Sequence, residues 1–330
     1  MKKNRLKYLI IGAGGTGGAS GAYLSKAGKD VSFIARGEHL DRMKSSGLRV
    51  IRPKDEFTID PVKAYSMDEY LALVERKPDE RPDVILVCVK GYSLDEASEF
   101  IGKITSSKDT DPEYDPIVIP ILNLYGTGGA LQKKLPGILV TDGCIYVASE
   151  VKEPGVILMN GYILRILFGL RKGEEDRGEP LNAKLKMIES DLKESDILGV
   201  FSDDIAKDAL LKFSYVSPQN ACGIYYDVPA GPIQEEGEIR EAFGELVHEI
   251  DVLADAMGIT FDEDIVQRNF KILDDLKPNM TTSLQRDLEK NKPNELDGLV
   301  YEVVRMGERY GVDLPLYREI SEALSERFKK

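Results

Sequence analysis

Residues 8–27 read YLIIGAGGTGGASGAYLSKA, and this stretch decides the fold class of the chain. A short apolar run leads into a glycine-rich turn of the form GxGxxG, which opens directly into a helical run. Glycines let the backbone turn tightly and approach a pyrophosphate, whose charge then lies on the unpaired N–H groups of the helix N-terminus. This order predicts a nucleotide-binding loop, with a tight turn that holds no ligand as the other interpretation. The residues expected to contact the cofactor are Gly12, Ala13, Gly14, Gly15, Thr16 and Gly17.

The end of the next apolar run indicates which cofactor is bound. Residues 31–34 read VSFI and lead into Arg36, at the place where an NAD-selective fold usually carries Asp or Glu on the ribose 2′-hydroxyl. A guanidinium there favours a 2′-phosphate, so we expect Arg36 to bind NADP(H), with a solvated surface arginine as the alternative. His39 follows closely, and we interpret it as a solvated loop histidine in preference to a neighbour of the adenine ribose phosphate.

The composition is that of a globular protein and excludes several partners. The chain has 330 residues, 42% hydrophobic and 31% charged, and single cores stop growing at about 250–300 residues, so we expect two domains. A net charge of −13 without a basic cluster argues against nucleic acid and anionic membranes as partners. Two histidines and three separated cysteines give no metal-ligand spacing, so we expect no metal site.

The first twelve residues, MKKNRLKYLIIG, run into the glycine turn without a cleavage-type segment, which argues against a signal peptide. The apolar runs at 84–89 and 117–122 are far shorter than the roughly 20 residues of a membrane helix. We therefore expect a cytoplasmic protein, and the sequence leaves open whether it forms a homodimer.

The first 200 residues alternate short apolar runs with helix-like stretches, which indicates βαβ units around a mostly parallel sheet. The expected strands are residues 7–11, 30–35, 84–89, 117–122 and 137–141. Three further runs, 143–151, 155–159 and 162–168, predict an antiparallel flap, because Asn160-Gly161 between two strands is a strong hairpin signal. The charged, proline-bearing segments 75–83 and 106–116 are expected to be surface loops.

Helical periodicity replaces this alternation later in the chain. One stripe of apolar residues at helical spacing lies in 181–192 and a second in 205–216. Two further stripes, in 239–257 and 296–310, stop at Gly258 and Gly311, which are natural helix ends. We therefore expect a cofactor-binding domain over residues 1–202 and an all-helical substrate domain over 203–330.

Several motifs in this order resemble the ketopantoate reductase (2-dehydropantoate 2-reductase) family. They are GAGGTG (12–17), VSFIARGEHL (31–40) with Gly47-Leu48, VCVKGY (87–92), PILN (120–123), LLKF (210–213) and TTSLQRDLEKNKPNELDGLV (281–300). The resemblance implies a Rossmann-type doubly wound α/β domain followed by an all-α domain, with the active site in the cleft between them. It also implies that NADPH gives a hydride to ketopantoate, producing pantoate on the route to pantothenate and coenzyme A.

The resemblance carries catalytic roles to two residues. Lys212 matches the family's proton donor to the carbonyl oxygen, and Glu295 matches its active-site glutamate. An ammonium of pKa about 10.4 donates downhill to an alkoxide-like oxygen and stabilises the charge that develops there. A snorkelling surface lysine and a helix-start carboxylate at Asn294-Glu295 are the structural alternatives.

Four more residues are implied to bind substrate: Lys90, Asn123, Asn220 and Ser283. The resemblance implies that Lys90 and Asn123 contact the cofactor as well. Lys90 also lies at the end of a predicted strand, where open α/β sheets present ligand-binding side chains. An ordinary strand-end charge at Lys90 and a capping cluster at Thr281-Thr282-Ser283 remain alternatives.

The sequence also departs from the family pattern. The family usually has Asn-Gly where Asn123 is followed by residues 124–129, LYGTGG, so we expect this loop to have a different shape. The family usually has an asparagine four residues after the catalytic lysine, where this chain has Val216, and Pro218 should kink the helix before Asn220. Two alternatives therefore stay open: a reductase or opine-type dehydrogenase of another 2-keto acid, and a non-catalytic NADP-binding regulatory protein.

Overall fold

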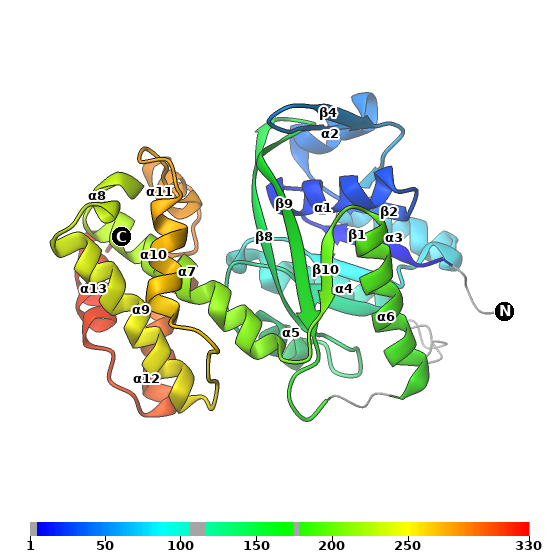
Figure 1. Ribbon diagram of the computed structural model, residues 1–330. Helices are drawn as coiled ribbons and strands as arrows, with labels where there is room; N and C mark the ends of the chain where they lie inside the picture. Colours follow the sequence, from blue (N-terminus) through cyan, green and yellow to red (C-terminus); the bar gives the residue numbers. More distant parts are fainter. Residues whose placement is uncertain (1–4, 106–115, 175–177, 330) are drawn as a thin grey trace. The chain divides into compact units, whose positions relative to one another are not determined.

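The computed structural model describes residues 5–105, 116–174 and 178–329, and the chain divides into two compact units (Figure 1). The N-terminal unit comprises residues 1–122 and 126–205. The helical unit comprises residues 123–125 and 206–330, so a three-residue piece of the loop around Asn123 belongs to it. No helix in the described residues is long and apolar enough to cross a membrane.

A five-stranded, fully parallel sheet forms the centre of the N-terminal unit. Its strand order is β5-β2-β1-β6-β7, with β1 at Lys7–Ile11, β2 at Asp30–Ile34, β5 at Lys63–Tyr65, β6 at Val84–Val87 and β7 at Ile117–Pro120. The chain runs outward from β1 in one direction and then starts again at β6 on its other side, so the order reverses between β1 and β6. In open α/β sheets, ligands bind outside the carboxyl ends of the strands at this reversal.

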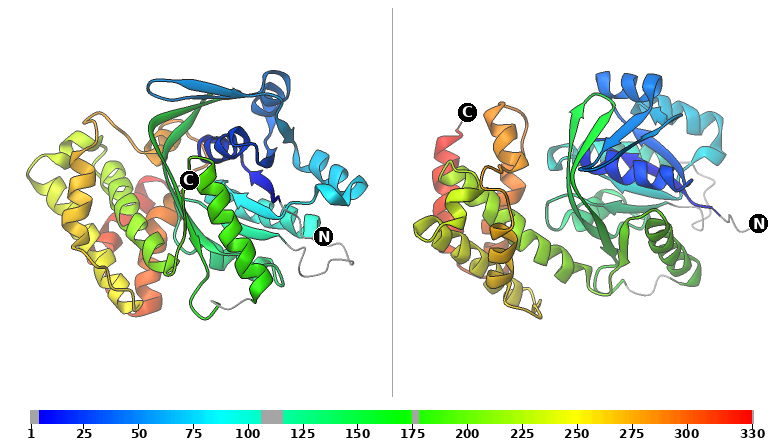
Figure 2. Two further views of the ribbon diagram at one scale, coloured as in Figure 1. Left: turned by 45° about the vertical axis from the view of Figure 1, so that its right-hand side comes forward. Right: turned by 45° about the horizontal axis from the view of Figure 1, so that its top comes forward.

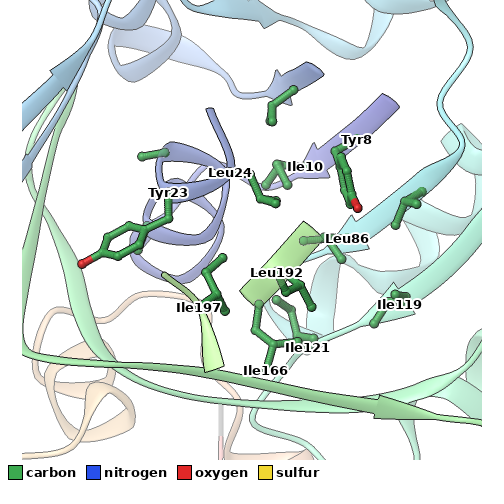
Figure 3. Packing of buried hydrophobic residues seen from close by; sticks show 14 of the residues in the cluster. Tyr8, Ile10, Tyr23, Leu24, Leu86, Ile119, Ile121, Ile166, Leu192 and Ile197 are labelled. Carbon is green, nitrogen blue, oxygen red and sulfur yellow. The ribbon is translucent and has the colours of Figure 1, made fainter. Parts of the chain in front are cut away.

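Side chains alternate across the sheet and build a core on each face. Tyr8 and Ile10 of β1 point into one cluster, whereas Leu9 and Ile11 point into the other, as the period of two requires. Figure 3 shows the first cluster, where Leu24 of α1 (Gly15–Lys26) and Leu192 of α6 (Glu179–Glu194) meet strand residues. The helices that pack in the second cluster are α3 (Met67–Arg76), α4 (Leu94–Thr105) and α5 (Thr127–Lys134).

A second, mixed sheet lies across α1 from the parallel one. Its strands are β3 (Leu48–Ile51), β4 (Glu56–Ile59), β8 (Asp142–Glu153), β9 (Val156–Gly169) and β10 (Leu198–Phe201). The order is β10-β9-β3-β4, and β8 pairs with β9 in a long antiparallel ribbon (Figure 2). Helix α1 contacts strands of both sheets, so it is sandwiched between them.

The predicted hairpin at Asn160-Gly161 is wrong. The chain reverses at Pro154-Gly155 instead, where Gly155 has φ +79°, and residues 156–169 form one strand. Val147 pairs with Leu164 and Ser149 with Met159, so residues 160–163 form a bulge opposite Ala148. Neither Asn160 nor Gly161 has the positive φ that a two-residue type I′ hairpin turn requires at both positions, so the chain continues through the bulge without reversing.

The predicted strand over 137–141 is reduced to a single bridge between Val140 and Val118. The side-chain amide of Gln132 occupies its outer edge, donating to the carbonyl of Ile138 at 2.8 Å and accepting from the N–H of Val140 at 3.1 Å. Of the two predicted loops, 75–83 contains the end of α3 and a 3₁₀ turn at Pro78–Glu80, and residues 106–115 lie outside the described part of the chain.

The helical unit is built from a bundle around one apolar core. Its helices are α7 (Ile205–Tyr225), α8 (Ala230–Gln234), α9 (Glu238–Ala256), α10 (Ile265–Asp274), α11 (Ser283–Glu289), α12 (Glu302–Tyr310) and α13 (Pro315–Arg327). The helix ends predicted at Gly258 and Gly311 are confirmed, since both residues have φ of +70° or more just after a helix. The fold class, a Rossmann-type α/β part followed by an all-α part, is confirmed.

Helix α7 continues on both sides of Pro218 because another residue replaces the missing donor. A proline has no N–H, so the carbonyl of Ser214 one turn earlier loses its helical partner. The fully buried Asn269 of α10 supplies one, since its Nδ2 donates to the Ser214 carbonyl at 2.9 Å and to Ser214 Oγ at 3.0 Å. Packing of α10 therefore completes the backbone of α7.

We expect Asn269→Leu to lower the free energy of unfolding by about 1–3 kcal/mol, because it leaves the Ser214 carbonyl buried without a donor. The loss should be smaller in a Pro218→Ala background, where residue 218 regains an N–H. Urea unfolding of the four proteins of this cycle measures both effects. An equal loss in the two backgrounds would contradict the pairing.

Candidate functional site

A cavity of about 440 Å³ lies in the N-terminal unit at the carboxyl ends of the parallel strands. Residues that follow β1, β2, β5 and β6 line it, which is where the reversal of strand order places a ligand. The lining includes five of the residues predicted to bind cofactor or substrate: Gly12, Ala13, Gly14, Arg36 and Lys90.

Three glycines of the loop are required by close backbone packing. Gly12 has φ +95°, and its N–H and that of Ala13 both donate to the carbonyl of Ile34, at 3.2 and 3.1 Å. A Cβ on Gly15 would lie 2.5 Å from the carbonyl oxygen of Ser149, and one on Gly17 would lie 2.2 Å from that of Gly12. Gly15, Thr16 and Gly17 form the first turn of α1 and are not among the residues that line the cavity.

Gly14 differs from these glycines because it faces open space. A Cβ there would meet no protein atom within 4 Å, and φ of −69° and ψ of −165° are open to any residue. Gly14 is also the N-cap of α1, which has no side-chain cap and no acidic residue in its first turn. The first N–H groups of a helix lack intrahelical partners and attract anions. The loop therefore fits a dinucleotide whose pyrophosphate approaches the backbone at Gly14.

Arg36 and Glu96 form a pair at the rim of this cavity. Their charged groups lie 3.4 Å apart, and the Arg36 side chain is 77% exposed. Exposed ion pairs contribute about 0–1 kcal/mol, so the guanidinium can exchange this carboxylate for a phosphate at little cost.

His39 is a bridge between two backbone segments, so its interpretation as a solvated loop residue is wrong. Nδ1 accepts from the N–H of Gly155 at 3.0 Å, and Nε2 lies 2.9 Å from the carbonyl oxygen of Ala13. The first bond requires an unprotonated Nδ1, so Nε2 carries the hydrogen and donates to Ala13. Burial lowers the pKa of His39, which favours this neutral form.

In the helical unit, Lys212, the predicted proton donor, contacts Asn123, a predicted substrate-binding residue. Lys212 lies in α7 and is only 8% exposed, and its Nζ donates to Oδ1 of Asn123 at 2.6 Å. The ammonium is thus a buried cation held by a neutral amide, unlike the snorkelling lysine that was the alternative. Asn123 is not part of the lining of the cavity in the N-terminal unit.

The loop that departs from the family pattern is anchored in the helical unit. The side chain of Leu124 lies against Gly298, where a Cβ would come within 2.9 Å of it, and Tyr125 packs on Phe213 with ring centroids 6.2 Å apart. These two contacts hold Asn123 beside α7.

Asn220 and Val216 follow Lys212 at spacings of eight and four residues on the same face of α7. Asn220 is 5% exposed, and its Nδ2 donates to the carbonyl of Val216 at 2.7 Å. Its Oδ1 is buried and has no hydrogen-bond partner among the described residues. Buried acceptors are almost always paired, so this oxygen is a candidate to accept a hydrogen bond from a ligand.

Glu295 and Ser283 differ sharply in their surroundings. Glu295 is buried, in a segment whose next residue, Leu296, donates its N–H to Oδ1 of Asn294 at 3.1 Å. Asn294 therefore caps the helical turn that follows, as the helix-start alternative proposed. Ser283 is exposed as the first residue of α11, which is capped by Thr282 in a capping box with Gln285. The structure does not bring Ser283 among the buried polar residues.

Two family models cover most of the chain: ketopantoate reductase PanE/ApbA matches residues 8–173, and its C-terminal counterpart matches residues 204–327. The chain belongs to this family. It is 26% identical over 316 residues to the uncharacterized oxidoreductase YkpB of Bacillus subtilis, covering 96% of each chain. It is 26% identical over 317 residues to a 2-dehydropantoate 2-reductase of Mesorhizobium japonicum, covering 92% of this chain and 91% of the relative. A solved D-mandelate dehydrogenase with NADH and anilino(oxo)acetate has the same fold, with a TM-score of 0.77, 21% identity and 96% of each chain covered.

In this member of the ketopantoate reductase family, the sequence did not point to several residues that line the cavity. Ser66 and Met67 follow β5, a three-residue strand whose pattern is too short to detect. Tyr92, Ser93 and Glu96 follow Lys90, and their place after a predicted strand was the available signal. No group of His, Cys, Asp and Glu that could hold a metal occurs in the described residues.

We expect Gly14→Ala to weaken dinucleotide binding about tenfold while leaving the melting temperature unchanged, because the new methyl group meets ligand and no protein atom. Titration with NADPH and NADH, alongside thermal unfolding of the free protein, tests this. Gly15→Ala is the matched control, since its methyl group would clash with Ser149 and lower stability. Unchanged binding by the Gly14 variant would show that no ligand approaches there.

Proposed function

We propose that this protein is an NADPH-dependent 2-dehydropantoate 2-reductase, which reduces the keto group of its substrate to a secondary alcohol and so forms pantoate for pantothenate and coenzyme A synthesis. One observation carries the proposal: a buried lysine ammonium, that of Lys212, is held by Asn123 in a chain of the ketopantoate reductase family. A buried ammonium whose direction is fixed by a neutral amide is suited to stabilise an anionic substrate and the charge that develops on its carbonyl oxygen.

Lys212 is proposed to act as the general acid. A bound reduced nicotinamide supplies the hydride, two electrons and one hydrogen nucleus, to the keto carbon. As the C=O bond becomes a C–O bond, the ammonium stabilises the charge on oxygen and passes one proton to it, and the neutral amine then regains a proton from water. Free alkoxides have proton affinities near that of hydroxide, whereas lysine has a pKa of about 10.4, so this transfer is downhill.

Asn123 and Asn220 are proposed to orient the substrate on α7. Asn123 fixes the direction of the ammonium through its Oδ1, which leaves its Nδ2 hydrogens to donate. The buried Oδ1 of Asn220 can accept a hydrogen bond from a substrate hydroxyl. From the family resemblance, Glu295 is proposed to help orient the reacting group, and Ser283 to bind the carboxylate.

The cofactor is proposed to lie in the cavity of the N-terminal unit. The N–H groups at Gly14 and the start of α1 would hold the pyrophosphate, and Arg36 the 2′-phosphate. Lys90, at the carboxyl end of β6, is proposed to lie near the nicotinamide.

We expect Arg36→Ala to raise KM for NADPH at least tenfold, about 1.4 kcal/mol, and to leave KM for NADH nearly unchanged, because only NADPH carries the 2′-phosphate. Steady-state kinetics with both cofactors measure the ratio. The control is Arg49→Ala, which removes a guanidinium paired with Glu56 outside the cavity. An equal effect of Arg36→Ala on both cofactors would refute the NADP assignment.

A second candidate is the reduction of a different 2-keto acid, and Val216 favours it. This residue places an apolar side chain between Lys212 and Asn220 on α7, where the family usually has an asparagine. Loss of one amide from a polar pocket changes discrimination between substrates by orders of magnitude. A keto acid with an apolar substituent suits this position, and the anilino(oxo)acetate in the solved D-mandelate dehydrogenase complex likewise carries an apolar ring beside an oxoacetate group.

We expect Lys212→Ala to reduce kcat about 10²–10⁴-fold with little change in NADPH affinity, because the general acid is lost and the cofactor cavity is untouched. NADPH absorbance, followed with 2-dehydropantoate and a panel of other 2-keto acids, measures turnover. Lys207→Ala, which removes a lysine of the same helix paired with Asp262, is the control.

The wild-type substrate profile separates the candidates. Turnover of 2-dehydropantoate that Lys212→Ala abolishes supports the proposed activity, and turnover of another keto acid alone supports the second candidate. Tight NADPH binding without turnover of any keto acid would indicate a regulatory NADP-binding protein.

A further inference from the structure

The strongest feature outside the proposed chemistry is His39, which uses both ring nitrogens to join the phosphate loop to a distant hairpin. Its Nε2 donates to the Ala13 carbonyl at 2.9 Å, and its Nδ1 accepts from the Gly155 N–H at 3.0 Å. His39 also lines the cavity beside Gly12, Ala13 and Gly14.

The bond to Ala13 fixes a peptide plane. In a trans peptide the carbonyl and the following N–H lie in one plane and point in opposite directions. A donor that holds the Ala13 carbonyl therefore also sets the direction of the Gly14 N–H. The N–H groups of Gly12 and Ala13 are already used by Ile34, so Gly14 provides the first N–H of the loop not committed to that carbonyl.

Without such a restraint this peptide would rotate easily, because glycines flank Ala13 on both sides. Glycine loses more conformational freedom on ordering than any other residue, and a loop that must order on binding loses affinity. Gly14 has no protein neighbour within 4 Å of a Cβ position, so packing does not restrain it. The hydrogen bond from His39 is the restraint that the structure provides at this carbonyl.

The second bond of His39 extends the restraint to the β8–β9 hairpin. Gly155 forms the turn of that hairpin, and Val151 of β8 lines the cavity. Farther along β8, the carbonyl of Ser149 packs against Gly15 closely enough to exclude a Cβ. The hairpin is thus held against the phosphate loop at two points, one through His39 and one through direct backbone contact.

We propose that His39 is a positioning residue for the cofactor: it holds the Ala13–Gly14 peptide so that the Gly14 N–H faces the pyrophosphate, and it couples this geometry to the hairpin turn at Gly155. The inference rests on the proposed function in taking the cavity as a site for a nicotinamide dinucleotide and Arg36 as the residue that binds its 2′-phosphate. Its effect is confined to ligands that carry the pyrophosphate, because the 2′-phosphate is held elsewhere, by Arg36.

The test compares two ligands on three proteins. NADPH carries the pyrophosphate, whereas adenosine 2′-monophosphate carries only the 2′-phosphate. His39→Phe keeps a ring of similar size but makes no hydrogen bonds. We expect it to raise the Kd for NADPH at least tenfold and the Kd for adenosine 2′-monophosphate less than twofold. His39→Gln, which offers one donor and one acceptor, should restore most of the NADPH affinity, and His248→Phe, on the exposed face of α9, should change neither Kd.

Several outcomes would overturn the inference. If His39→Phe weakens the binding of both ligands equally, the residue has a general structural role. If it weakens the binding of neither ligand, the bridge is irrelevant to binding. Should His39→Phe fail to fold, hydrogen exchange of the wild type decides: NADPH should slow exchange at Gly155, which lies outside the cavity lining, and protection confined to residues 12–17 would refute the coupling.

The same titrations keep this inference separate from the proposed function. If the wild type binds NADPH and His39→Phe weakens that binding, but no keto acid is reduced, the positioning role of His39 is supported and the reductase proposal is refuted. If the wild type binds neither NADPH nor NADH, both the reductase proposal and the positioning role of His39 are refuted.

Discussion

The N-terminal unit depends on how closely α1 can approach two sheets at once. Glycines on this helix make that approach possible: a Cβ on Gly21 would lie 2.3 Å from the ring of Phe33 in β2, and one on Gly18 would lie 2.6 Å from Ile157 in β9. Each glycine costs a helix interior up to about 1 kcal/mol relative to alanine. The cost is offset by burial, since the helix is enclosed from Gly17 to Leu24. The glycines after the phosphate loop therefore serve packing, whereas a Cβ on Gly14 would project into open space.

The sequence was most informative where a segment is apolar and continuous. Strands β1, β2, β6 and β7 are buried on both faces of a parallel sheet, so their runs of Val, Ile and Leu stand out. Strands β3, β4, β5 and β10 are three or four residues long and mix exposed with buried or half-buried positions, which leaves little periodic signal. The second sheet could not be predicted for that reason, although its longest ribbon was expected as a flap.

In the candidate site, too, the sequence predicted some residues and not others. Gly12, Arg36 and Lys90 follow predicted strands, so the topology of a doubly wound sheet brings them to one cavity. The bridge made by His39 has no such signal, because its partners are backbone atoms of residues 13 and 155, which leave no mark in the pattern of side chains. The spacing of residues along the sequence also could not show that Leu124 packs on Gly298 and so holds Asn123 beside α7. The roles of Lys212, Glu295 and the substrate-binding residues remain predictions.

The proline in α7 has a consequence for how the protein is assembled. A helix that carries an interior proline forms poorly by itself, because one carbonyl lacks its donor. Here the donor arrives with Asn269, 55 residues later in the chain. The helix that presents Lys212 is therefore completed only when α10 docks, and secondary and tertiary structure form together at this point. A partly folded or truncated chain that lacks α10 would hold its lysine on an incomplete helix, so the surroundings of Lys212 depend on the cooperative folding of the whole helical unit.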